Sequence, residues 1–319
     1  MKIRLVILAA VALLCSGCGG NRKAERFSAL PFPSVLPPAM MEEPKDRAEY
    51  MAYNYWNRIT DTVALGPSDS LLVNGVRRSD VEQKFADWTS VLEMTDIGFA
   101  RRSVKRLYER VARCETHDTS SALFETFTAL VDKYLYDPNS PLRNEDLYGA
   151  YAECLSESPL VDADMKGVYA HQARMCALNR VGTAAADFRF ADSRGRLRTL
   201  YGIDAELTLL FFSNPGCTAC KEIIDVLNND PVISRLITDG TMAVLNIYID
   251  EDIESWRSYM SIYPENWYNG FDPDYVIRGE TLYNVRAIPS LYLLDRDKVV
   301  LMKDVPETRL FDRLGKMSF

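Results

Sequence analysis

The spacing of hydrophobic residues changes once along the chain, near residue 182. Between residues 45 and 181, apolar residues recur at intervals of three and four, which is typical of amphipathic helices. Ser79 and Glu82 have the spacing of a capping box at the start of one of these helices. The clearest helical stretches are 81–92, 104–111, 123–134, 147–154 and 168–178. We therefore predict an all-α N-terminal domain over residues 45–181.

After residue 186 the pattern becomes that of a sheet with helices. Residues 207–212 form an apolar run broken only by Thr208, as expected for a strand that is buried on both faces, and 242–249 is predicted to be another buried strand. Shorter strands are predicted around 188–190, 291–294 and 299–302, and helices at 221–229, 253–263 and 306–317. The resulting order, β-β-α-β-α-β-β-α, predicts an α/β domain over residues 182–319 with helices on the faces of its sheet.

The N-terminal segment has the pattern of a targeting signal. Basic residues at positions 2 and 4 precede an apolar stretch, 5–14, that is too short to span a bilayer. Small residues then precede Cys18, which resembles the cleavage site of bacterial lipoprotein signals. Residues 1–18 are thus predicted to be a lipoprotein signal peptide with lipidation at Cys18, and the Pro-rich residues 19–44 a semi-rigid linker. We expect the protein to be anchored to a membrane by lipid, in the periplasm or at the cell surface.

Composition narrows the class of function. The chain has 319 residues, of which 47% are apolar and 26% charged, so it has the length for two globular domains. Its net charge of −8 argues against nucleic acid as a partner. Seven cysteines are encoded, and outside the cytoplasm a CxxC pair indicates redox chemistry or metal binding. No cofactor is indicated.

The CxxC pair is Cys217 and Cys220, directly after the predicted strand 207–212. A thiol at the N-terminus of a helix has a lowered pKa, because the free N–H groups and the helix dipole stabilise the thiolate. Cys217 is therefore the predicted nucleophile. Cys220 lies about one turn later and would resolve a mixed disulfide.

Residues 182–319 resemble the TlpA/ResA-like thiol–disulfide oxidoreductases of the thioredoxin superfamily. The matching residues are Asp187-Phe188, Leu209–Phe212, Cys217–Cys220 and Ile288-Pro289 followed by Tyr292–Asp295. The resemblance implies a thioredoxin-like fold and a cis peptide bond before Pro289. It further implies protein or peptide thiols and disulfides as substrates, and a membrane redox donor. It places the substrate groove at Gly216, Thr218, Ile288 and Pro289. The whole chain is also similar to Gram-negative lipoproteins that carry a helical domain before such a thioredoxin domain.

The sequence departs from this pattern where a proton-transferring acid is expected. Thioredoxin has an acid at the position of Phe211, and TlpA-like members have one at the position of Ile223. Glu222, or a water molecule, is the candidate substitute. Gly216 replaces the usual Trp, and no charged residue lies between the cysteines, which favours a reductase over a strong oxidant.

Several alternatives remain open from the sequence. The domain can be an adaptor whose disulfide stays closed. It can also be a peroxidase, since residues 214–218 resemble the peroxidatic motif of one peroxiredoxin group, although Asn214 stands where that group has Thr. A zinc site is not expected, because both histidines, His117 and His171, lie in the helical domain. The remaining cysteines are expected to be buried and free, with one disulfide among them as the alternative: Cys114, Cys154 and Cys176.

Overall fold

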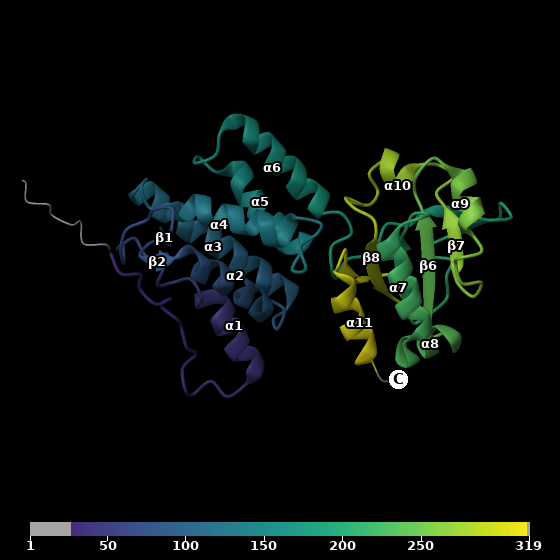
Figure 1. The fold of residues 1–319 in the computed structure, drawn as a ribbon, viewed down its shortest axis with the longest axis horizontal. Helices are drawn as coiled ribbons and strands as arrows, with labels where there is room; N and C mark the ends of the chain where they lie inside the picture. Colours follow the sequence, from purple (N-terminus) through teal and green to yellow (C-terminus); the bar gives the residue numbers. More distant parts are fainter. Residues whose placement is uncertain (1–26, 318–319) are drawn as a thin grey trace, which may run out of the picture.

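The computed structural model describes residues 27–317, and in them an all-helical half is followed by an α/β half, as predicted (Figure 1). The predicted lipidation site, Cys18, and the signal segment lie outside the described residues. None of the helices between residues 27 and 317 is long and apolar enough to cross a bilayer.

The helical half is built around one aromatic core. Its helices are α1 Pro44–Asn54, α2 Arg78–Leu92, α3 Ile97–His117, α4 Leu123–Val131 with a π-helical extension Asp132–Tyr136, α5 Glu145–Glu157 and α6 Ala163–Cys176. Trp56 lies at the centre and makes edge contacts with Trp88 and Phe127, at ring-centroid distances of 5.8 and 4.7 Å. Such aromatic pairs bury large areas and fix the packing angles of the helices that carry them.

Two local features of this half differ from the prediction. A short hairpin, β1 Leu72–Val73 and β2 Val76–Arg77, precedes α2. The predicted capping box is wrong, because α2 begins two residues earlier than the box requires and its N-cap is Arg77. Ser79 instead bonds to Asp80, and Glu82 accepts hydrogen bonds from Lys133 and Tyr134 of the π-helical segment.

The predicted linker is not purely a spacer. The Leu30 N–H donates to the Gly75 carbonyl at 2.8 Å, and the Phe32 ring packs edge-on against Trp56 at 5.7 Å. Leu30 and Phe32 interrupt the proline-rich segment and pack, partly buried, against the core of the helices, so this part of it is held on the helical half.

The α/β half contains one mixed sheet of seven strands in the order β4-β3-β7-β6-β5-β8-β9. The strands are β3 Arg189–Asp192, β4 Leu197–Thr199, β5 Leu207–Phe212, β6 Met242–Tyr248, β7 Tyr268–Phe271, β8 Ser290–Asp295 and β9 Val300–Lys303. The helices are α7 Thr218–Asn229, α8 Pro231–Thr238, α9 Ile253–Tyr259, α10 Val276–Gly279 and α11 Glu307–Gly315. Central β5 pairs in parallel with β6 and antiparallel with β8.

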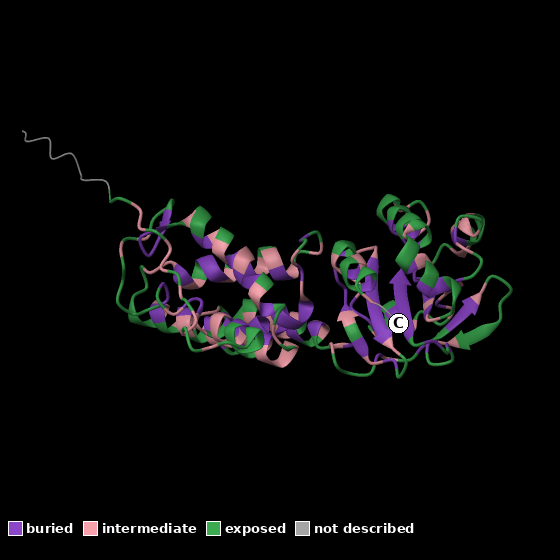
Figure 2. Ribbon diagram, turned by 90° about the horizontal axis from the view of Figure 1, so that it is seen from below, coloured by how far each residue is buried: buried purple, intermediate pink, exposed green. Residues whose placement is uncertain are grey.

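Both faces of β5 are covered, which explains why its sequence is apolar except for Thr208. Leu209 and Phe211 belong to the core shared with α7, α8 and α11. Leu210 and Phe212 belong to the core on the opposite face, together with Ile277 of α10. Figure 2 shows the central strands as buried. The two cores fix the end of β5, from which the loop to the cysteines leaves.

Strand β7 was not predicted. Its sequence, Tyr268 to Phe271, contains Asn269 and Gly270 and therefore lacks a continuous apolar pattern. Asn269 is nevertheless buried, because its side-chain oxygen accepts a hydrogen bond from Asn246 of β6 at 3.0 Å. The stretch between α9 and Tyr283 thus adds a strand to the sheet.

Candidate redox active site

The two cysteines of the CxxC pair are joined by a disulfide at the start of α7. Gly216 has a φ of +73°, a conformation that strongly favours glycine. Cys217 then caps the helix, and its Sγ accepts the backbone N–H of Cys220 at 3.1 Å. A hydrogen bond to this sulfur favours its negatively charged form once the disulfide is reduced.

Burial separates the roles of the two sulfur atoms. Cys217 is half-buried, whereas Cys220 is only 2% exposed and packs in the core beneath α7. A substrate therefore has access to Cys217. Phe211, at the position of the acid of thioredoxin, lies in the same core and is fully buried.

The loop between β5 and Cys217 is held by polar side chains of the neighbouring strands. Ser213 donates to the side chain of Asn246, and Asn214 donates to Asp250 at 2.6 Å. The Asn214 amide is thus directed to a carboxylate of the next loop. This network fixes the approach to the disulfide.

The Ile288–Pro289 bond is cis and lies at the start of β8, next to β5. Ile288 contacts both hydrophobic cores of the domain. It lines, with Pro289 and with Ala219 from between the cysteines, a cavity of about 540 Å³. Strand pairing therefore brings together two motifs that are far apart in the sequence.

Of the other predicted site residues, Glu222 lines this cavity as well and is exposed. Gly216 and Thr218 flank Cys217 and are exposed, but they do not line the cavity. The predicted groove residues thus fall into two groups: Gly216 and Thr218 lie beside Cys217, whereas Ile288 and Pro289 line the cavity.

The helical half also borders this cavity. Pro138, Asn139, Pro141 and Arg143, between the π-helical segment and α5, form part of its lining. Figure 1 shows α11 and β8 on the side of the α/β half that faces the helices.

A buried charge network joins the two halves beside the proline. Glu145, at the start of α5, accepts from Arg286 at 2.7 Å and from Asn284 at 2.8 Å, and it pairs with Lys303 at 3.0 Å. Glu145 and Lys303 side chains are each only 1% exposed. Arg286 lies two residues before Ile288. Glu145 of the helical half therefore fixes the position of the segment that precedes the cis bond.

Asp304 extends the network to the other side of the proline. Its carboxylate accepts the Ser290 hydroxyl at 2.7 Å. Burial, followed by repulsion from Glu145, raises the pKa of Asp304 to about 6. The residues before and after Ile288-Pro289 are therefore both held by groups at the domain interface.

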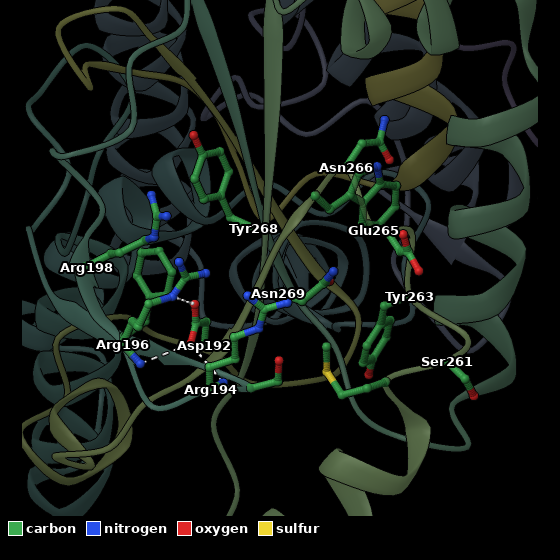
Figure 3. Close-up of a pocket in the computed structure, with 14 residues that line it drawn as sticks. Asp192, Arg194, Arg196, Arg198, Ser261, Tyr263, Glu265, Asn266, Tyr268 and Asn269 are labelled. Atoms are coloured by element: carbon green, nitrogen blue, oxygen red, sulfur yellow. Dashed lines mark hydrogen bonds and ion pairs between the residues drawn. The ribbon is translucent and has the colours of Figure 1, made fainter.

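A second cavity, of about 710 Å³, lies away from the cysteines (Figure 3). It is bordered by the β3–β4 hairpin and the segment before β7. Arg196 pairs with Asp192 at 2.7 Å, and the Arg198 guanidinium lies 5.4 Å from the Tyr268 ring centre. Neither cysteine of the disulfide lines it.

The other cysteines are not redox partners of the pair. Cys114 and Cys176 are buried and free, and Cys154 is half-buried and free. Burial raises the pKa of Cys154 to about 11 and that of Cys176 to about 12. Within residues 27–317 no group of three or more His, Cys, Asp or Glu side chains is arranged to hold a metal ion.

Solved structures are similar to most or part of this chain. A thioredoxin-like protein from Bacteroides caccae ATCC 43185 is 33% identical, with a TM-score of 0.74, and covers 91% of this chain and 100% of its own. The C-terminal domain of an uncharacterized protein from Bacteroides fragilis NCTC 9343 is 42% identical over 43% of this chain and 99% of its own, with a TM-score of 0.42. A domain of a possible thiol-disulfide isomerase from Cytophaga hutchinsonii ATCC 33406 is 25% identical over 44% of this chain and 94% of its own, with a TM-score of 0.38.

The α/β half is a thioredoxin-like domain. This follows from its sheet, from the disulfide at the start of α7 and from the likeness to the Bacteroides caccae structure. Residues 18–179 match the family described as Domain of unknown function (DUF5106). The chain therefore belongs to the DUF5106 family and carries a thioredoxin-like domain after the helical one. No curated protein matches the chain.

Proposed function

We propose that this protein is a thiol–disulfide oxidoreductase that acts outside the cytoplasm on disulfides of proteins or peptides. The observation that carries the proposal is the Cys217–Cys220 disulfide at the N-terminus of α7, with one accessible and one buried sulfur. This is the arrangement that two-step exchange requires, because the first thiol must reach the substrate and the second must reach only the first.

The reaction begins with the reduced protein. The Cys217 thiolate attacks one sulfur of a substrate disulfide, and the other substrate sulfur leaves as a thiolate. Cys220 then loses its proton and attacks the Cys217 sulfur. The protein disulfide forms again and the second substrate thiol is released, so the protein has lost two electrons and the substrate has gained two.

Cys220 must lose its proton before it attacks, and the sequence does not identify the base that accepts this proton. Phe211 places a hydrocarbon where thioredoxin has its acid. The exposed carboxylate of Glu222, in the cavity beside Ala219, is the proposed acceptor, through water. A membrane redox donor would return the two electrons to the disulfide.

The location is part of the same proposal. The predicted signal segment and Cys18 would place the protein in the periplasm or at the cell surface, anchored by lipid to a membrane of a Gram-negative bacterium. In such a compartment a dithiol needs a dedicated donor to remain reduced. Labelling with radioactive palmitate in the producing cell, compared with Cys18→Ala, tests the anchor.

The test of the activity is the reduction potential of the pair and the pKa of Cys217, measured on the chain that follows the predicted signal. We expect a reversible couple between about −120 and −270 mV and a thiol pKa below ~8.5. Cys217→Ser is the control and should abolish both signals. A disulfide that cannot be cycled would instead identify the domain as an adaptor that binds partners with its disulfide closed.

A further inference from the structure

Residues of both domains line the cavity beside the disulfide, and this lining is both apolar and negatively charged. Its apolar lining comes from α7, the cis-proline segment and α11: Ile223, Val226, Ile288, Pro289, Pro306 and Phe311. The segment 138–143 of the helical domain supplies the opposing wall, with Pro138 and Pro141 adding further apolar surface. An apolar side chain next to a substrate cysteine would find a nonpolar surface here.

Two carboxylates occur in this lining without cationic partners. Glu222 on α7 and Glu307 at the start of α11 are both exposed, and neither forms an ion pair within residues 27–317. The one basic side chain in the lining, Arg143, is buried and points elsewhere. Its guanidinium donates to the carbonyls of Asp304 and Val305, each at 3.0 Å. The open side of the cavity therefore carries negative charge.

Buried hydrogen bonds hold segment 138–143 of the helical domain in place. The bonds from Arg143 tie segment 138–143 to the residues that precede Pro306, and Asp304 in turn accepts the Ser290 hydroxyl next to Pro289. Both sides of the cavity are thus linked through buried groups. The distance between the wall and the cis-proline is therefore fixed by the domain interface rather than by a free hinge.

We infer that the helical domain determines the substrate specificity of the oxidoreductase. The inference rests on the proposed function and names the class of substrate. The cavity selects an extended segment of unfolded polypeptide that carries an apolar side chain and a lysine or arginine close to the reactive cysteine. The apolar side chain lies between segment 138–143 and Phe311, and the basic group pairs with Glu222 or Glu307.

Two short peptides test the inference with the full chain in its reduced form. Each has one cysteine in a mixed disulfide with thionitrobenzoate and a leucine beside it, and they differ only in carrying two lysines or two glutamates nearby. Attack by Cys217 releases thionitrobenzoate, which is the better leaving group because its thiol pKa is low. Its absorbance gives a rate constant for each peptide, and the ratio of the two rate constants is the readout.

We expect the lysine peptide to react about tenfold faster at low salt, and the ratio to fall as salt is raised, because the carboxylates are exposed. The double variant E222Q/E307Q should bring the ratio close to one. N139K, which places a positive charge on the wall from the helical domain, should also lower the ratio. The matched control is E109Q/E157Q, which removes two exposed glutamates of α3 and α5 outside the cavity and should keep the wild-type ratio.

The outcomes separate the inference from the proposed function. Release of no thionitrobenzoate from either peptide by the wild-type chain would overturn the proposed function and the inference with it. Equal rates for both peptides, or the same loss of preference in the control as in E222Q/E307Q, would overturn the inference alone. A preference that N139K leaves unchanged would show that the helical domain does not contribute to selection.

Discussion

The buried charge of Glu145 permits a quantitative prediction about how the two domains are held together. Replacing Glu145 with alanine removes the carboxylate that pairs with Lys303 at 3.0 Å and accepts from Arg286 at 2.7 Å. Lys303 is then left with only the carbonyls of Cys176 and Leu178. Lys303 would remain in a nearly dry interface without its counter-charge, and Arg286 would keep only Asp304 as a counter-charge, at 3.7 Å.

The magnitude follows from burial. Removing one partner of a buried ion pair costs about 3–5 kcal/mol, because the remaining charge has lost water as well as its partner. Glu93 and Arg309 form the matched comparison at the same interface, at 3.1 Å, but their side chains are 35% and 26% exposed. A pair that water reaches to this extent contributes about 0.2–1 kcal/mol. We therefore expect E145A to lower the free energy of unfolding by several times more than E93A.

Urea denaturation followed by circular dichroism gives the overall change, and hydrogen exchange resolves where it occurs. Two-domain proteins need not unfold in one step, so the exchange data are essential. In E145A the amides of α5 and β9 should lose protection before those of helix α1, which packs on α2 and α3. E145Q, which keeps an oxygen for Arg286 and Asn284, should be intermediate. Equal losses in E145A and E93A would refute the reasoning from burial.

Three further predictions concern single residues. Cys220→Ser should accumulate a mixed disulfide between Cys217 and a peptide substrate, visible by intact mass; absence of the adduct would argue against Cys217 as the nucleophile. Gly216→Ala should cost about 1–2 kcal/mol in urea denaturation, because φ is +73° although the site is open, whereas Gly279→Ala, with equal space and no positive φ, should cost less. Asp304 has a pKa raised from 3.8 to about 6, so the folded state binds its proton more tightly than the unfolded chain and ionised Asp304 is destabilising above that pH. The stability of Asp304→Asn relative to wild type should therefore improve by up to about 3 kcal/mol from about pH 4 to about pH 8, and a difference that is independent of pH would contradict this assignment.

The sequence by itself determined the features that depend on neighbouring residues. The nearly continuous apolar run at β5 predicted a strand buried on both faces, and a CxxC pair after it placed a thiol at the start of a helix. Much of the secondary structure and the position of the CxxC pair were predictable because hydrophobic period, turn residues and helix ends are local properties of the chain.

Where local patterns were weak, the prediction failed. Strand β7 contains Gly270, where an added Cβ would lie 2.6 Å from the Phe190 side chain. Its buried Asn269 is acceptable only because Asn246 of the neighbouring strand supplies a hydrogen bond. Neither reason is visible without the sheet.

Only the tertiary structure decided how the helical domain takes part in the site. Glu145 looks like an ordinary acid in the first turn of a helix, and its partners Arg286 and Lys303 lie far along the chain. Nothing in the spacing of these residues predicts that they meet, because a charge is stable in an interior only when distant segments bring its partners to it. The sequence therefore specified a CxxC pair at the start of a helix, whereas the packing of two domains placed a wall of helical-domain residues near it.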